Sequence, residues 1–254
     1  MLTRQLVNLS TIMKGTYKYQ VQPQEVDFLK EMTFVRLGDC ILTTAGKNAT
    51  GNGFGIQQLQ KINATWILSK IAIEMIAPLR EFQNYAIETW VEDVGRVGTT
   101  RNFNILDEQG NAIGGASSVW AMLNLSTRRP VDLQSLEKLK ESAEGGNPPI
   151  EKPMRLPDVS GESISRHTIK YSDIDMNAHV NSVSYIKWLC DLFPKETYTK
   201  KFIRRFELNY INESLWGEKI EIFREERQTD DFFFEMKRDD RTICKARVFW
   251  TERK

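Results

Sequence analysis

The sequence carries the same order of predicted elements twice, and this duplication restricts the fold more than any other feature. In the first half, alternating apolar residues predict a strand over 16–22, and helical spacing predicts a helix from Phe34 to Ala45 that ends at Gly46. Four strands are predicted to follow it, over 66–76, 85–91, 99–106 and 112–125. In the second half a predicted strand at 165–171 and a helix at 180–192 precede four strands, over 202–211, 217–226, 231–237 and 242–251. This order indicates an internal duplication.

A helix followed by a run of antiparallel strands suits a curved sheet wrapped around its helix. One copy alone would leave a sheet edge exposed, whereas two copies joined edge to edge cover both edges. We therefore expect an α+β chain of two tandem hot-dog units that form an internal pseudo-dimer. The expected units are an N-terminal unit over 1–130, a linker with a short helix over 131–157 and a C-terminal unit over 158–254.

The composition excludes several classes of function. The 35 Lys and Arg residues nearly balance the 34 Asp and Glu residues, so no strong overall field favours nucleic acid or a membrane surface. No apolar run approaches the ~18–20 residues that a membrane span needs, so stable membrane insertion is not expected. The three cysteines are widely spaced, which predicts neither a disulfide framework nor a zinc site and favours a reducing compartment.

The first 19 residues lack acidic side chains and carry Arg4, Lys14 and Lys18, a weak similarity to an organelle transit peptide. The strand pattern begins almost at once, at Gly15, which favours an ordinary N-terminal extension. We therefore expect a cytoplasmic bacterial protein and do not expect plastid import.

The chain has only two histidines, and one of them lies directly before the second predicted helix. Asp175, Asn177 and His179 are spaced by two, so in an extended backbone their side chains share one side, beside the free N–H groups of a helix start. Thioester hydrolysis needs a positioned water, a base and oxyanion donors, and this group can supply them. Asp and Asn are also ordinary capping residues, so spacing alone leaves both interpretations open. The other histidine, His167, is predicted to be an exposed strand residue, and no neighbouring Cys or His suggests a metal site.

The run from Ser172 to Trp188 resembles the signature of the acyl-ACP thioesterase family. Four other segments resemble parts of the same family in the same order: 51–55, 66–70, 88–91 and 118–124 with Arg128 and Arg129. The resemblance covers roughly residues 15–254. It implies a double hot-dog fold and hydrolysis of fatty acyl-ACP to a free fatty acid, in fatty acid biosynthesis. It also implies an acyl carrier protein as partner, with no metal and no organic cofactor.

The resemblance further implies a catalytic set of Asp175, Asn177, His179 and Glu213. Either Glu213 or His179 would act as the base. Asn177 would orient the substrate carbonyl or the water, and Asp175 would set the charge and orientation of its neighbours.

Two further positions bear on the mechanism. Plant members of the family usually have Cys directly after the catalytic Glu, whereas this chain has Ser214. A cysteine nucleophile is therefore not available there, which favours water activated by a carboxylate–imidazole pair. The backbone N–H groups near Val180 and Asn181 are the expected oxyanion donors.

Comparison of the two halves predicts one active site per chain. Aligning them at the predicted helix starts places Leu29, Glu31 and Thr33 opposite the Asp, Asn and His of the second half, and Pro78 opposite Glu213. The N-terminal copy is then free to shape an acyl pocket. Candidate lining residues are Phe34, Leu37, Trp66 and Trp120.

Two basic clusters, Arg128–Arg129 and the 200–205 segment with Lys200, Lys201, Arg204 and Arg205, are either docking sites for an acidic carrier or ordinary solvated faces. An acyl-CoA thioesterase and a non-catalytic acyl-binding hot-dog protein are the alternative functions. The linker and N-terminal half argue against the first, because small acyl-CoA hydrolases are usually single units. Retention of all four polar positions argues against the second. A homodimer is compatible with the sequence.

Overall fold

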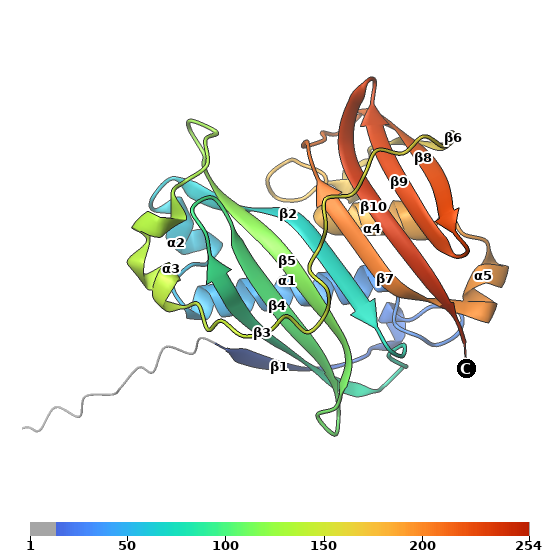
Figure 1. Cartoon of the computed structure of the whole chain (residues 1–254), viewed down its shortest axis with the longest axis horizontal. Helices are drawn as coiled ribbons and strands as arrows, with labels where there is room; N and C mark the ends of the chain where they lie inside the picture. Colours follow the sequence, from blue (N-terminus) through green and yellow to red (C-terminus); the bar gives the residue numbers. More distant parts are fainter. Residues whose placement is uncertain (1–13, 254) are drawn as a thin grey trace, which may run out of the picture.

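The computed structural model describes residues 14–253, whose ten strands form one continuous antiparallel sheet (Figure 1). The strand order is β1-β3-β4-β5-β2-β7-β10-β9-β8-β6. The first half contributes β1 (Gly15–Gln20), β2 (Ala64–Met75), β3 (Asn84–Val94), β4 (Thr99–Asp107) and β5 (Ala112–Asn124). The second half contributes β6 (Glu162–Thr168), β7 (Lys201–Tyr210), β8 (Lys219–Gln228), β9 (Asp231–Arg238) and β10 (Arg241–Glu252). From β2 outward the strands are β5, β4, β3 and β1, and from β7 outward their counterparts in the second half follow in the same order, β10, β9, β8 and β6. The two halves are therefore related by a pseudo-twofold axis. The predicted double hot-dog fold is confirmed.

Each half wraps its sheet around one principal helix. These are α1 (Phe34–Gly51) and α4 (Ser182–Cys190), and the shorter helices are α2 (Ile56–Gln60), α3 (Glu137–Glu141) and α5 (Lys195–Lys200). Three 3-10 turns complete the described elements: η1 (Pro23–Glu25), η2 (Leu133–Ser135) and η3 (Tyr171–Asp173).

Three predicted helix boundaries were wrong, one of them the end of the second helix, which lies at Cys190 and not at Leu192. The first helix does not end at Gly46 but continues to Gly51, because Gly46 lies on an open face where a glycine costs only propensity. The second helix begins at Ser182 rather than at Val180, because Asn181 caps it by accepting a hydrogen bond from the Val183 N–H.

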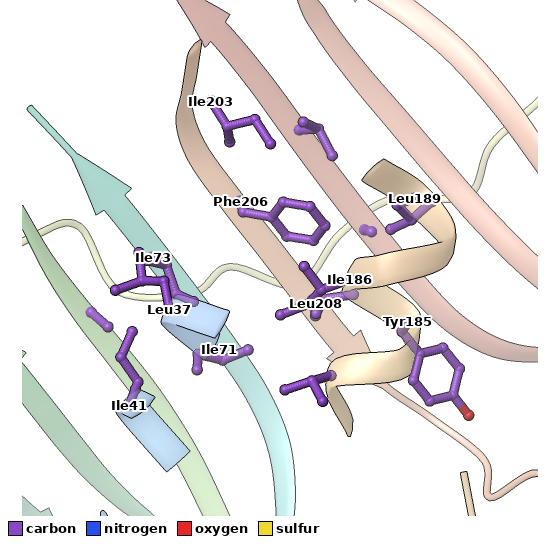
Figure 2. Close-up of a cluster of buried hydrophobic side chains, with 14 of the residues drawn as sticks. Leu37, Ile41, Ile71, Ile73, Tyr185, Ile186, Leu189, Ile203, Phe206 and Leu208 are labelled. Atoms are coloured by element: carbon purple, nitrogen blue, oxygen red, sulfur yellow. The ribbon is translucent and has the colours of Figure 1, made fainter. Parts of the chain in front are cut away.

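The two principal helices meet at Gly38, close to the pseudo-twofold axis. A Cβ atom on Gly38 would lie 2.9 Å from Cδ1 of Ile186, so any larger residue there would have to displace the end of that side chain. Figure 2 shows the surrounding core, in which side chains of α1 and α4 pack against β2 and β7. Each fully buried aliphatic or aromatic side chain there contributes roughly 1.5–3 kcal/mol.

The junction between the halves is the pairing of β2 with β7, which runs from Lys70 opposite Asn209 to Glu74 opposite Arg205. Its outer face carries buried polar groups. The Arg205 guanidinium donates to Glu74 Oε1 at 2.5 Å and to Glu207 Oε2 at 2.9 Å. Burial raises the pKa of Glu207, and the Arg205 guanidinium counteracts that effect only in part.

The segment before β6 runs across this face and satisfies the remaining groups. The backbone N–H of Met154 donates to Glu207, and the N–H of Leu156 donates to Asn209 Oδ1 at 3.0 Å. The linker therefore packs over the β2–β7 junction and is hydrogen-bonded to it.

These contacts contradict one proposed docking face. In the 200–205 segment, Lys201 pairs with Asp230 at 2.6 Å, Arg204 lies 3.7 Å from Glu74, and Arg205 is buried. Only Lys200 is both exposed and outside these ion pairs. Arg205 is therefore excluded from a carrier-docking face, and the pairing of Lys201 and Arg204 within the chain favours the alternative, an ordinary charged face that stabilises the junction and its flanks.

The cysteines and the possibility of a membrane span were also considered from the sequence. Cys40, Cys190 and Cys244 are free thiols, and within residues 14–253 no helix is long and apolar enough to cross a membrane. Residues 1–13, on which most of the expected N-terminal extension falls, lie outside the described residues.

Arg205→Ala should lower the free energy of unfolding by about 3–5 kcal/mol, because it leaves the buried Glu207 carboxylate without its cation. Urea denaturation followed by circular dichroism measures the change. Lys200→Ala, an exposed neighbour, is the matched control and should stay within about 0.5 kcal/mol of the parent chain. Equal, small effects of both substitutions would contradict the role assigned to Arg205.

Candidate active site

The loop between η3 and α4 is a closed turn rather than the extended segment that the sequence suggested. Ile174 and Val180 pair across it, and the Asp175 N–H donates to the His179 carbonyl at 2.8 Å. Ala178 has a φ of 63°, in the left-handed region, which reverses the chain. The predicted route by which Asp175, Asn177 and His179 come together was therefore wrong.

The three residues nevertheless belong to one turn, which the Asp175 side chain organises. The Asp175 carboxylate accepts from the backbone N–H of Asn177 at 2.8 Å and of His179 at 3.4 Å. It therefore holds the turn together from inside. The Asn177 side chain is exposed, with its amide nitrogen 3.5 Å from Asp175 Oδ2.

The imidazole of His179 faces Glu213, which follows β7. His179 Nε2 lies 3.4 Å from Glu213 Oε2, and the same oxygen accepts a hydrogen bond from Arg128 Nη2 at 2.5 Å. These side chains are 30%, 38% and 49% exposed, for His179, Glu213 and Arg128, so water reaches all three. The structure thus brings together an imidazole, a carboxylate and a guanidinium from three separate segments.

Arg128 is the residue of this group that sequence reasoning did not place in the site, because it left Arg128 as either a carrier-docking residue or part of an ordinary solvated face. It lies in the turn after β5, in the first half, with a φ of 56° and its N–H bonded to the Asn124 carbonyl at 2.9 Å. The hydrogen bond to Glu213 raises the pKa of Arg128. Its occurrence in a family-like segment was a signal for function, but no local spacing indicated its contact with Glu213.

The expected oxyanion donors are already occupied. The Val180 N–H donates to the Ser214 carbonyl at 3.0 Å, and the Asn181 N–H donates to the Asp173 carbonyl at 2.8 Å. The prediction that they hold the oxyanion was therefore wrong. The first of these bonds ties the loop to the segment after β7, which places Glu213 beside His179.

Asp173 fixes the base of the loop. Its buried carboxylate accepts from the Lys170 N–H at 2.8 Å and the Trp188 indole at 3.2 Å, and it lies 3.1 Å from His167 Nε2. Burial raises the pKa of Asp173, but these hydrogen bonds together outweigh burial and hold that pKa below its ordinary value.

His167 is therefore not the exposed strand residue that was predicted. Its side chain is 26% exposed and its ring centre lies 4.3 Å from that of Trp188. It braces Asp173 and does not contact the His179 cluster through any described hydrogen bond. Within residues 14–253 no group of three or more His, Cys, Asp or Glu side chains is arranged to hold a metal ion.

The backbone hydrogen bonds of the first half correct the alignment of the two copies. The Asp27 N–H donates to the Glu31 carbonyl at 2.8 Å, as Asp175 does to His179. Asp27, Leu29 and Glu31 therefore stand opposite Asp175, Asn177 and His179. The predicted alignment was two residues out because the second helix had been started two residues early.

With this alignment, Asp175 has an equivalent in the first half, Asp27, and its role is structural. The Asp27 carboxylate accepts from the N–H groups of Leu29 at 2.8 Å and Glu31 at 3.2 Å, which is the role of Asp175 in the second half. The aspartate thus shapes the turn in both copies. Pro78 stands opposite Glu213, since the Met32–Leu79 backbone bond corresponds to the Val180–Ser214 bond. Only the second half therefore combines an amide, an imidazole and a carboxylate.

The other predicted positions are dispersed. Ser214 is only 1% exposed, which leaves its hydroxyl unable to meet a substrate. The Trp66 indole donates to the Phe54 carbonyl at 2.9 Å, and the Trp120 indole donates to Ser118 at 2.8 Å. Phe34 and Leu37 line a cavity at the other end of β7. The four proposed acyl-pocket residues therefore do not line one common pocket.

Comparisons with known proteins agree over almost the whole chain. The family models "Acyl-ACP thioesterase N-terminal domain" and "Acyl-ACP thioesterase C-terminal domain" match residues 13–136 and 158–252. A chloroplastic oleoyl-acyl carrier protein thioesterase of Coriandrum sativum is 27% identical over 220 residues, which are 77% of this chain and 58% of that protein. The chain thus spans somewhat more than half the length of this curated relative.

Two solved structures are also similar. An acyl-ACP thioesterase from Bacteroides thetaiotaomicron is 40% identical, with a TM-score of 0.89 over 94% of this chain and 98% of that one. A 12:0-ACP thioesterase from Umbellularia californica has a TM-score of 0.83 at 18% identity, over 95% of this chain and 98% of that one. The second likeness concerns the fold alone.

The equivalence of Asp27 and Asp175 can be tested through stability. Replacement of either residue with Ala should lower the free energy of unfolding by about 1–2 kcal/mol, because each carboxylate accepts two backbone N–H groups of its turn. Thermal and urea unfolding of the two variants gives the comparison. A loss confined to Asp175→Ala would show that the two turns are not equivalent.

Proposed function

The chain belongs to the acyl-ACP thioesterase family, and from this we propose that it hydrolyses the thioester of a fatty acyl carrier protein and releases a free fatty acid. The observation that supports the activity most directly is the pair formed by His179 Nε2 and Glu213 Oε2 at 3.4 Å, in which His179 stands in the same turn as the exposed Asn177. A carboxylate–imidazole pair open to water is suited to activating a water molecule.

In the proposed reaction, the water oxygen attacks the thioester carbonyl carbon while His179 accepts a proton from that water. The Glu213 carboxylate orients the imidazole and stabilises the imidazolium. The Asn177 amide donates to the developing oxyanion, the part first assigned to backbone N–H groups that are occupied in the structure. Cleavage of the C–S bond then releases the acid, and the departing sulfur takes the proton from His179.

Arg128 favours His179 over Glu213 as the base. Arg128 Nη2 donates to Glu213 Oε2 at 2.5 Å, and His179 Nε2 faces the same oxygen at 3.4 Å, so this oxygen is already engaged by two side chains. The contact with Arg128 restricts Glu213 to the orientation that faces His179. In this mechanism Asp175 acts through the turn that it stabilises, as a positioning residue.

One chain supplies every side chain of this mechanism, so neither a homodimer nor a particular cell compartment is needed for it. A panel of acyl-ACPs and the matching acyl-CoAs, assayed for thiol release, tests the substrate. Faster turnover of acyl-ACP at matched chain length is expected. A preference for acyl-CoA would replace the proposed substrate, and no release from either would favour a non-catalytic acyl-binding protein.

His179→Ala and Glu213→Gln should each lower kcat for acyl-ACP by about 10²-fold or more, because the two side chains act as one unit. Ser214→Ala is the control from the adjacent position and should keep kcat within about threefold, since its hydroxyl is buried. Near-normal turnover of both site variants would refute the assignment, provided that circular dichroism shows them to be folded.

The carrier protein is expected to approach the rim beside Arg128, where Arg129 is exposed. Carrier proteins are acidic, and rim charges act mainly on association. Arg129→Glu should therefore raise KM for acyl-ACP several-fold, with kcat almost unchanged and a smaller effect on acyl-CoA. Lys200→Glu, on the distant flank of β7, should leave both KM values unchanged. A larger effect of Lys200→Glu would place docking at the opposite end of the molecule.

A further inference from the structure

A cavity of about 580 Å³ opens between the two halves, lined by residues next to α5 and the start of β7. Figure 1 shows where these two elements lie in the fold. Its walls come from the 27–33 turn, the first turn of α1, the end of β2, the C-terminal end of α4 and the start of β7. A volume of this size is typical of small-molecule sites.

This cavity is separate from the catalytic cluster. Ile203 lies in its wall, whereas Glu213 follows the far end of β7 at Tyr210. Ile203 and Tyr210 are seven positions apart in the strand, which corresponds to roughly 23 Å at ~3.3 Å per residue. The buried side chains of Phe206, Leu208 and Ile186 fill the interior between the two ends (Figure 2). An acyl chain held at His179 therefore does not enter this cavity through the core.

The cavity occupies the pseudo-symmetric counterpart of the active site, but with different chemistry. Thr33 and Asn181 cap the two principal helices, and the β2–β7 pairing is symmetric about Ala72 and Glu207. These relations pair four apolar wall residues with four hydroxyl-bearing residues at the catalytic end. The pairs are Phe34 with Ser182, Leu37 with Tyr185, Met75 with Tyr210, and Leu79 with Ser214. Hydroxyls near the catalytic cluster thus correspond to hydrocarbon in the cavity.

The rim of the cavity carries two lysines, Lys187 and Lys195, and the Lys195 ammonium lies 5.1 Å from the centre of the Phe28 ring. Glu31 and Arg253 form a two-pronged ion pair at 2.8 and 2.7 Å, and the Asp27 carboxylate is held by backbone N–H groups. Lys187 and Lys195 are exposed, and over residues 14–253 no carboxylate lies within 4.0 Å of either ammonium. Asp191, at the end of α4, is the one further carboxylate in the lining. The rim therefore offers two ammonium groups to an anionic head above an apolar interior.

We propose that this cavity is a second ligand site, which binds a free long-chain fatty acid with its alkyl chain inside and its carboxylate at Lys187 and Lys195. The proposal rests on the proposed function in one respect, because the reaction would supply this class of ligand. A single apolar chain matches the Phe34, Leu37 and Met75 wall, and a carboxylate matches the two ammonium groups.

The test uses the full chain titrated with palmitate by isothermal calorimetry. Val35, half-buried in the cavity lining, allows a blocking substitution: Val35→Trp should remove one equivalent of bound palmitate. The exposed double variant Lys187→Glu/Lys195→Glu should raise the Kd for palmitate at least tenfold. The matched control, Lys138→Glu on α3, should not change it. All variants should keep kcat for acyl-ACP within about twofold.

Unchanged palmitate stoichiometry and Kd in both cavity variants would overturn the proposal. Hexadecanol that binds this site as tightly as palmitate would overturn the assignment of the carboxylate to the lysines. Failure of the proposed function would look different. If the chain hydrolysed no thioester but bound palmitate, and Val35→Trp removed that binding, the second site would stand and only the proposed reaction would be refuted. Conversely, hydrolysis without cavity-dependent palmitate binding would remove the second site and leave the proposed function intact.

Discussion

The pairing of β2 with β7 is the contact on which both the fold and the candidate site depend. It joins the open edge of each half through five residue pairs, and without it each half would expose a row of unpaired backbone groups. The same pairing sets the turn after β5 beside the end of β7, so that Arg128 of the first half reaches Glu213 of the second. The buried Arg205–Glu207 pair and the linker stabilise that junction from outside.

The near-symmetry of the two halves separates what the fold requires from what the chemistry requires. An aspartate inside the turn is present in both copies, at Asp27 and Asp175, because each turn must satisfy its backbone N–H groups. His179 and Glu213 have no equivalent in the first copy, where Glu31 and Pro78 stand instead. A residue shared by both copies is thus explained by the turn, and only the unshared residues need a functional explanation.

The sequence predicted the fold well because strand and helix periodicity is local, and because a repeated order leaves few ways to bury two sheet edges. It failed where a contact joins distant segments. Arg128 looked like a surface cation until the junction placed it on Glu213, and Arg205 looked exposed until the linker covered it. The alignment of the two copies was wrong because it relied on apolar spacing to find the start of the second helix. Capping by Asn181 determines where α4 begins.

The two ends of β7 also account for the single catalytic centre that we propose for the chain. At the proposed catalytic end, Glu213 contacts both Arg128 and His179 and is partly exposed to solvent. Its charge is therefore available to a substrate. At the other end Glu31 is only 6% exposed and both of its oxygens contact Arg253. A carboxylate desolvated and neutralised in this way has little charge left to polarise an imidazole or a water. A histidine at position 31 would therefore lack the partner that His179 has, because Pro78 stands at the position equivalent to Glu213, and the apolar wall suits the cavity to holding hydrocarbon instead.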